Sequence, residues 1–176
     1  VVLAGQGTAQ YLEDGKLKYI PYNRLFSEYR LIDFPGYDEP FEVYANRDSL
    51  LYREVYGLAD IPNILRGTIR YRGFCEAWNA LIKIGLTDSS YPILDSDKIS
   101  CHEWMEAYVG SGNGVSVKDR IAELIGENPF SPVMKKLEWL GLFRKKKINI
   151  RQATPALILE KLLLKKWKLK DSDRDL

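Results

Sequence analysis

Polar residues that suit anion binding recur at every second position of residues 66–72: Arg66, Thr68, Arg70 and Arg72. In a β-strand the side chains alternate between two faces, so these four share one face, while Leu65, Ile69 and Tyr71 lie on the other. A guanidinium group binds a carboxylate or a phosphate through two parallel hydrogen bonds. The spacing predicts a strand with one face for the core and the other for a ligand with several anionic groups. An ordinary solvent-facing strand is the competing interpretation.

A second polar segment, Asn46-Arg47-Asp48-Ser49, directly follows the predicted strand at residues 41–45. Asp48 is placed to orient the Arg47 guanidinium through a charge-assisted hydrogen bond, which leaves the other edge of the guanidinium for a ligand. A purely structural Arg–Asp pair is the alternative. Asp48 or Ser49 is also predicted to cap a short helix that runs to Tyr56. Because both segments lie at or beside predicted strands, we expect them to meet in one region of a sheet.

Composition restricts the classes of protein to which this chain can belong. It has 176 residues, of which 45% are hydrophobic and 28% charged, which is ordinary for a folded domain and excludes general disorder. A net charge of +2 argues against nucleic acid or an anionic membrane as the main partner. Cys75 and Cys101 are too few for a disulfide framework and predict free thiols in a reducing compartment.

The order of patterns predicts an α+β fold, with a mixed or antiparallel sheet in the first half and four to five helices after it. We expect a strand-rich part at residues 1–75 and a mainly helical part at residues 76–176. Strands are predicted at residues 16–20, 41–45 and about 64–74, and the end of a helix at residues 1–11. One helix is predicted to start near Cys75. Capping residues predict the starts of four later helices, at Ser100, Ser116, Ser131 and Thr154.

Other segments that resemble functional motifs give weaker evidence for a site. The Gly5–Gln10 segment has two glycines in dinucleotide spacing but Gln10 in the third position, and the Gly110–Gly114 segment lacks the Lys-Ser/Thr ending of a phosphate loop. His102 is the single histidine and lies in a helix cap, away from any nucleophile or metal-ligand pattern. Lysines make the C-terminal part basic, which is typical of a solvated helix face.

The two polar segments resemble the saccharopine dehydrogenases of the NADP-dependent, L-glutamate-forming type. The resemblance rests on Asn46-Arg47-Asp48-Ser49 together with Leu65-Arg66-Gly67-Thr68-Ile69-Arg70-Tyr71-Arg72-Gly73, and it continues in order across the chain to Asp173-Arg174-Asp175. Ala45 is a departure, because relatives more often carry proline before the Asn-Arg pair. The helical second half matches only loosely.

This resemblance implies a domain that is inserted between the parts of a Rossmann cofactor domain. The family interconverts saccharopine, a tricarboxylate secondary amine, with glutamate and 2-aminoadipate semialdehyde, and NADP carries the hydride. Arg47 and Thr68 match the family's substrate contacts, and we add Arg66 and Arg70 because they share a face with Thr68. The resemblance places no catalytic, cofactor-binding or metal-binding residue in this chain.

We therefore expect a substrate-binding domain of a longer cytoplasmic enzyme, which by itself binds no NADP and is inactive. The resemblance also implies a homodimer, with no membrane or nucleic-acid partner. The chain begins Val1-Val2-Leu3 and ends Asp173-Arg174-Asp175-Leu176, which favours a domain cut from a longer protein. The alternative function is a stand-alone sheet that binds an anionic polymer, such as RNA or single-stranded nucleic acid, through its arginines and tyrosines.

Overall fold

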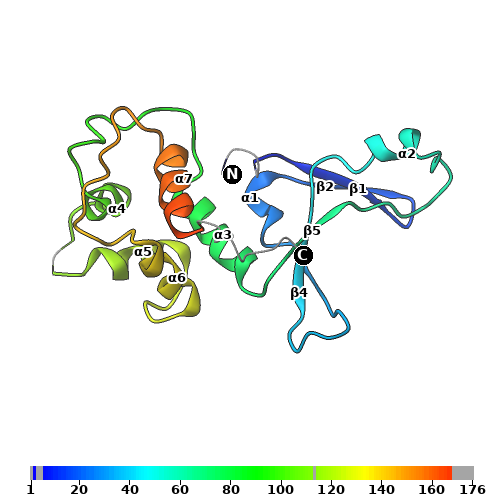
Figure 1. Cartoon of the computed structure of the whole chain (residues 1–176), viewed down its shortest axis with the longest axis horizontal. Coiled ribbons are helices and arrows are strands. Elements are labelled where there is room, and N and C mark those ends of the chain that lie inside the picture. Colours follow the sequence, from blue (N-terminus) through cyan, green and yellow to red (C-terminus); the bar gives the residue numbers. More distant parts are fainter. Residues whose placement is uncertain (1, 3–5, 113, 168–176) are drawn as a thin grey trace. The chain divides into compact units, whose positions relative to one another are not determined.

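The computed structural model describes residue 2, residues 6–112 and residues 114–167 of the chain. It divides into two compact units: Gly5–Lys83 forms one, and Val1–Ala4 with Ile84–Leu176 forms the other. Strands lie in the first unit and most helices in the second (Figure 1), so the α+β prediction is confirmed. The division falls near the end of helix α3 (Phe74–Ile84), later than the boundary expected at residue 75.

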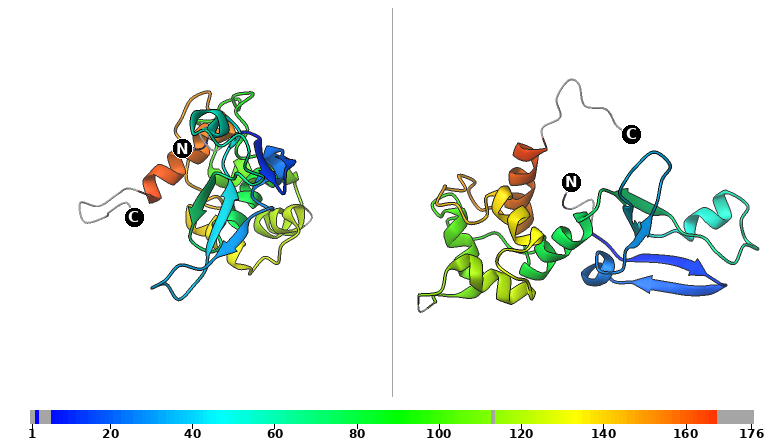
Figure 2. Two further views of the ribbon diagram at one scale, coloured as in Figure 1. Left: turned by 90° about the vertical axis from the view of Figure 1, so that its right-hand side faces the viewer. Right: turned by 90° about the horizontal axis from the view of Figure 1, so that it is seen from below.

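The first unit begins with an antiparallel hairpin of β1 (Ala9–Glu13) and β2 (Lys16–Ile20), which Figure 2 shows as a long blue ribbon. The turn residues Asp14 and Gly15 have φ angles of 51° and 71°, the left-handed conformation that a two-residue hairpin turn requires. The strand predicted at residues 16–20 is confirmed. The helix end expected at residues 1–11 is wrong at Ala9–Tyr11, because pairing with β2 makes this stretch a strand.

A second sheet has the order β3–β4–β5, formed by β3 (Arg30–Ile32), β4 (Phe41–Ala45) and β5 (Gly67–Arg70). Short helices α1 (Tyr22–Leu25) and α2 (Leu51–Val55) connect the strands. All pairings are antiparallel, and β4 and β5 align so that Glu42 faces Arg70 and Tyr44 faces Thr68. The prediction of β4 is confirmed, whereas β5 is shorter than the strand expected at residues 64–74.

Both faces of β5 are largely exposed, so the prediction that one of them packs on the core is wrong. Leu65, Ile69 and Tyr71 were expected to pack on the core, yet 41%, 46% and 65% of their surfaces are exposed. The face shared by Thr68 and Tyr44 is the one that adjoins an aromatic cluster, in which the Phe26 ring lies 4.6 Å from Tyr44 and 6.2 Å from Phe74. This cluster depends on tertiary structure, since α1 leads to Phe26, and α3 begins at Phe74 shortly after β5.

Helix α3 begins near Cys75 as predicted, but its first turn is capped from another strand. The Glu42 carboxylate of β4 accepts the backbone N–H groups of Gly73 and Cys75, at 2.6 and 2.7 Å. Glu42 is only 1% exposed, so this contact lies inside the protein. A carboxylate at this position satisfies amides that the helix itself leaves unpaired and favours the positive end of the helix dipole.

Within its described residues the second unit contains α4 (Cys101–Val109), α5 (Val117–Ile125), α6 (Pro132–Leu140) and α7 (Pro155–Lys166). Each begins at the capping residue that the sequence indicated: the side chains of Ser100, Ser116, Ser131 and Thr154 each accept an N–H group three residues later. Ser100 and Glu103 form the reciprocal capping box. Figure 2 shows these helices gathered in one group. The buried side chains of this unit include Trp104, Ile121 and Leu137.

The described residues contain no helix that is both long and apolar enough to cross a membrane. They also contain no group of three or more histidine, cysteine or acidic side chains that could hold a metal ion. Cys75 and Cys101 are both free thiols, and both are buried.

Candidate functional site

Three of the predicted site residues follow the alternation of strand β5. Arg66, Thr68 and Arg70 lie two residues apart, so they project to the same side of the sheet. The strand partners confirm the register: the Arg66 carbonyl accepts the Asn46 amide at 2.8 Å, Thr68 faces Tyr44, and Arg70 faces Glu42. The structure therefore brings these three side chains to one face, as the spacing predicts.

The two arginines of this face stand over aromatic rings. The Arg66 guanidinium donates to the Tyr52 hydroxyl at 2.6 Å and lies 5.1 Å from the centre of the same ring. The Arg70 guanidinium lies 5.2 Å from the Phe74 ring centre and donates to the Ile69 carbonyl at 2.9 Å. A guanidinium has five N–H groups, so each keeps donors for a ligand, while the stacking restricts its orientation.

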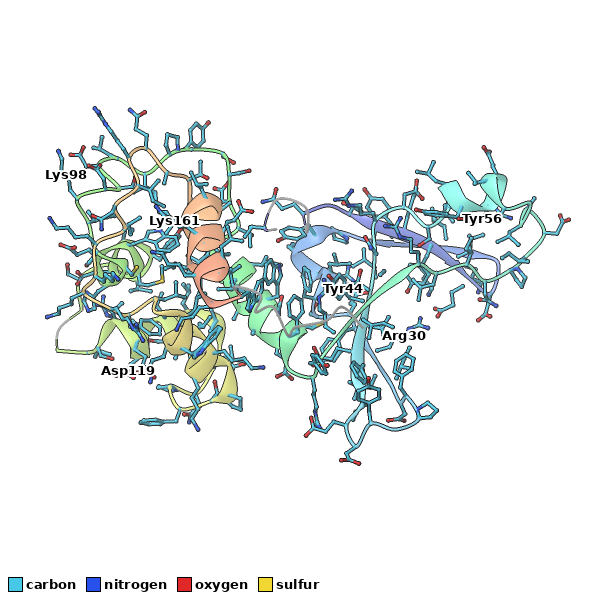
Figure 3. All side chains as sticks on the ribbon, viewed as in Figure 1. Arg30, Tyr44, Tyr56, Lys98, Asp119 and Lys161 are labelled. Carbon is cyan, nitrogen blue, oxygen red and sulfur yellow. The ribbon has the colours of Figure 1, made fainter. Side chains whose placement is uncertain are left out.

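Thr68 lies between the two arginines and faces Tyr44 across the paired strands. Figure 3 labels Tyr44 where the aromatic side chains of this unit gather. Burial raises the pKa of Tyr44, and the charge of Arg70 and the nearby Thr68 side chain oppose that rise. Tyr44 is therefore a neutral hydroxyl at physiological pH, and it extends the polar face beside the guanidinium groups.

The Asn46–Ser49 segment is held by backbone hydrogen bonds on both of its sides. Towards β1, the Gln10 amide donates to the Arg47 carbonyl at 3.0 Å, and the Ser49 amide donates to the Gln10 carbonyl at 2.9 Å. Towards β5, the Arg66 amide donates to the Ser49 hydroxyl at 2.9 Å, and Ser49 is fully buried. This network places Arg47 in the segment that adjoins Arg66, so the two polar segments meet in one region, as predicted.

Arg47 has a left-handed backbone, with a φ angle of 53°. A non-glycine residue in this region costs about 1–2 kcal/mol relative to a right-handed backbone. Such strain persists only where surrounding contacts hold it, and it concentrates at functional positions. The bonds of Gln10 to the Arg47 carbonyl and the Ser49 amide supply that hold, and the exposed side chain of Arg47 is presented from a fixed backbone.

Asp48 was expected to orient Arg47 or to cap a helix. Its carboxylate accepts the Leu50 amide at 2.8 Å, which forms a tight turn just before α2. The N-cap position of α2 is Leu50, which forms no side-chain cap, so the prediction of Asp48 or Ser49 as the cap residue is wrong. Ser49 instead links the segment to Arg66.

Sequence reasoning missed three residues that shape this face: Glu42, Tyr44 and Tyr52. Glu42 and Tyr44 looked like alternate positions of an ordinary strand, and Tyr52 like part of a short helix. Only the register of β4 against β5 shows that Glu42 and Tyr44 face Arg70 and Thr68. An acidic residue inside a strand that is otherwise apolar was the available signal for Glu42, since a buried carboxylate needs a partner.

The glycine segments do not fit a dinucleotide. Such a site needs a glycine turn that opens directly into a helix, whose N-terminus holds the pyrophosphate. Gly7 instead leads into strand β1, and α5 begins at Val117 with the Ser116 cap already filling its first turn. Neither glycine segment therefore has the geometry of a dinucleotide turn, and we assign no residue of them to NADP.

The site can now be compared with known proteins. A family model described as "Saccharopine dehydrogenase C-terminal domain" matches residues 1–176. The chain belongs to this family. Saccharopine dehydrogenase (NADP(+), L-glutamate-forming) of Saccharomyces cerevisiae is 30% identical over 158 residues, which are 86% of this chain and 35% of that protein. The mitochondrial alpha-aminoadipic semialdehyde synthase of Rattus norvegicus is 32% identical over 142 residues, which are 76% of this chain and 15% of that protein.

Among solved structures, apo histidine-tagged saccharopine dehydrogenase (L-Glu forming) from Saccharomyces cerevisiae has a similar fold. Its TM-score is 0.75 with 27% sequence identity, over 97% of this chain and 39% of that one. The chain thus spans well under two thirds of the length of these relatives. The comparisons do not support the alternative of a stand-alone nucleic-acid-binding sheet.

Proposed function

We propose that this chain is the substrate-binding domain of an NADP-dependent, L-glutamate-forming saccharopine dehydrogenase. The enzyme would interconvert saccharopine with glutamate and 2-aminoadipate semialdehyde in lysine metabolism. The observation that carries the proposal is the polar face of β5, where Arg66, Thr68 and Arg70 lie beside the Arg47 segment. Relatives with matching sequence are named for this reaction.

The proposed substrate matches the spacing of the face. Arg66 and Arg70 are four residues apart on one strand, which separates their backbones by about 13 Å. Saccharopine has three carboxylates distributed along an extended chain, so separate arginines can bind separate carboxylates. Arg47 would bind one of them, and the hydroxyl of Thr68 would position the substrate between the arginines.

NADP would be held by a cofactor domain of the same longer protein, outside these 176 residues. The fungal relatives are named for NADP, and this chain matches only 35% and 40% of their length, which supports a further domain. This chain would then bind and orient the substrate without carrying out hydride transfer alone.

We propose the cytoplasm as its compartment, because two buried free thiols suit a reducing environment. Fluorescent tagging tests this location, and a mitochondrial signal, as in the name of the rat relative, would contradict it.

We propose the face of the β3–β4–β5 sheet that carries Phe41 and Tyr71 as the surface for homodimer formation. The Phe41 ring contacts three exposed aromatic residues, with ring centres at 5.4 Å for Phe34, 4.9 Å for Tyr37 and 5.2 Å for Tyr71. A contiguous apolar patch of this kind on a sheet face marks an interaction site. In sedimentation velocity we expect Tyr71→Lys to weaken self-association, and a wild-type chain that stays monomeric at high concentration would overturn the proposal.

Saccharopine binding and turnover test the proposed function directly. Isothermal titration calorimetry measures whether saccharopine binds the chain, and a chimera in which this chain replaces the matching segment of the Saccharomyces cerevisiae enzyme tests turnover. We expect saturable binding and saccharopine-dependent reduction of NADP. A folded chimera that binds NADP but does not turn over, together with no saccharopine binding by the chain, would overturn the proposal.

Arg47→Lys is the sharpest variant, because lysine keeps the charge and loses the two-pronged guanidinium. We expect a fall in kcat/KM that corresponds to a loss of about 2–4 kcal/mol of transition-state stabilisation. Thr68→Val should cost less, about 1–2 kcal/mol. Arg72→Lys, at an exposed position beyond the end of β5, is the matched control and should leave turnover unchanged. Wild-type turnover in Arg47→Lys would remove Arg47 from the substrate site.

A further inference from the structure

The second unit contains a pocket that the proposed function does not use. It lies between α7, the N-terminus of α4, and the segment that follows α6. Its volume is about 100 Å³, and its apolar lining includes Cys101, Leu140, Ile148, Ile158 and Leu162. Hydrogen bonds fix its walls, because the Cys101 and His102 amides donate to the Lys146 and Arg144 carbonyls, at 3.1 and 3.0 Å.

The charged residues that line this pocket are all basic: Arg144, Lys146, Lys147, Lys161, Lys165 and Lys166. We call the site formed by these cations and the apolar lining the basic pocket. Lys161 and Lys165 are four residues apart on α7, so they lie on the same face, where like charges repel. Figure 3 shows Lys161 on α7 in the helical unit. The apolar residues Ile158 and Leu162 have the same spacing, so the helix presents cations beside an apolar surface.

The cations of the basic pocket keep their charge available for a ligand. Within the part of the chain that the structure describes, none of the six forms a salt bridge. Lys166 instead lies 4.7 Å from the Trp139 ring centre. Glu103, an acidic residue whose pKa Lys147 helps to lower, is occupied by the Ser100 amide and hydroxyl, each at 2.7 Å.

The positive field extends to the apolar lining of the pocket. Burial raises the pKa of the Cys101 thiol, and the charges of Lys165, Arg144 and Lys146 act against that rise. Three cations from two different segments therefore act on one buried point. The arrangement differs from a solvated helix face, on which lysines point apart into water over no shared cavity.

We propose that the basic pocket binds a small amphiphilic anion, with a carboxylate or phosphate head and a short apolar group. The head would lie among the lysines, and the apolar group would enter the lined cavity. A cavity of about 100 Å³ has about the volume that three water molecules occupy in the liquid, which suits an alkyl group of a few carbons. This site is in the second unit, and the proposal is independent of the saccharopine site in the first.

Calorimetry with the complete 176-residue chain tests the proposal with defined probes. Butyl phosphate and pentanoate are the amphiphilic probes, and they distinguish a phosphate head from a carboxylate head. Inorganic phosphate lacks the alkyl group, and butanol lacks the charge. We expect at least one amphiphilic anion to bind with one-to-one stoichiometry at low salt, at least about tenfold more tightly than inorganic phosphate, since each buried methylene contributes to affinity. Butanol should give no saturable heat.

Two variants locate the binding site. The double variant Lys161→Gln, Lys165→Gln should weaken the amphiphilic anion by about tenfold or more, because it removes both α7 charges. The matched control Lys16→Gln, Lys135→Gln makes the same change in net charge at exposed positions outside the pocket and should stay within about twofold of wild type. Leu162→Ala should reduce the advantage of butyl phosphate over inorganic phosphate.

Several results would overturn the proposal. Absence of saturable binding by both amphiphilic anions would remove the site. Equal affinity for butyl phosphate and inorganic phosphate would show that the apolar lining takes no part. An equal loss in the control pair would assign the binding to net charge. Circular dichroism of every variant confirms that it is folded, and the half-buried Leu162 offers a second test if the lysine pair does not fold.

Discussion

Glu42 provides the strictest test of how the site face is built. Its buried carboxylate accepts the Gly73 amide at 2.6 Å and the Cys75 amide at 2.7 Å, and so joins β4 to the first turn of α3. The Glu42→Gln substitution keeps the shape of the side chain and one acceptor oxygen. The other oxygen becomes an NH₂ group, which can only face an N–H donor with a donor of its own.

The cost of Glu42→Gln follows from the two hydrogen bonds. A hydrogen bond to a charged group contributes about 1.5–3 kcal/mol, and an unsatisfied buried N–H costs about 1–3 kcal/mol. One bond is lost, and the other becomes neutral, so we expect the free energy of unfolding to fall by about 2–4 kcal/mol. Loss of the negative charge at the helix N-terminus acts in the same direction.

Urea unfolding followed by circular dichroism measures this change. Glu39→Gln is the matched control, because Glu39 is exposed and lies three residues away in the loop before β4. Amide hydrogen exchange gives a local measurement, and protection of Gly73 and Cys75 should fall most in Glu42→Gln. The reasoning is refuted if Glu42→Gln and Glu39→Gln have the same stability, since the carboxylate would then contribute no net capping energy.

Three further predictions concern backbone fit and ionisation. Gly67→Ala should destabilise by about 1–3 kcal/mol in urea unfolding, because its Cβ would lie 2.6 Å from Val43 Cγ1; an unchanged midpoint would contradict this close approach. Arg47→Gly should be more stable than Arg47→Ala by about 1 kcal/mol in thermal denaturation, since glycine accepts the φ of 53° without strain, whereas equal stability would argue against that backbone. Burial and the Glu42 charge raise the pKa of Cys75, so the unfolded chain loses its thiol proton first, and above pH about 8.5 stability should fall by up to about 1.4 kcal/mol per pH unit. Denaturant titrations across that pH range should show a smaller fall in Cys75→Ala, and an identical pH dependence would exclude Cys75 as the source.

The elements that sequence predicted best are those whose cause lies within a few residues. Ser100, Ser116, Ser131 and Thr154 cap their helices through amides three residues later, so each start is visible in four consecutive letters. Strand β2 and strand β4 were likewise visible as short alternating or apolar runs. Strand β1 was missed because its conformation depends on pairing with β2 across the Asp14-Gly15 turn.

The candidate site divides in the same way between local and distant causes. The two-residue period of Arg66, Thr68 and Arg70 determined by itself that they share a face, because side chains of a strand alternate regardless of the partner. How far each face is covered was decided only by tertiary structure, and the prediction that Ile69 packs on the core was wrong. Alternation specifies two faces, whereas the exposure of each depends on the segments that pack beside the strand.

The sequence alone therefore determined the helix starts, two of the strands, the shared face of the arginines and the resemblance to saccharopine dehydrogenases. Tertiary structure decided the partners of these residues: Tyr52 under Arg66, Tyr44 beside Thr68, and Glu42 at the start of α3. The physical reason is the separation along the sequence over which each interaction acts. Capping and alternation act over two to four residues, while these contacts join segments 14 to 33 residues apart, whose encounter depends on strand register and on the packing of the whole unit.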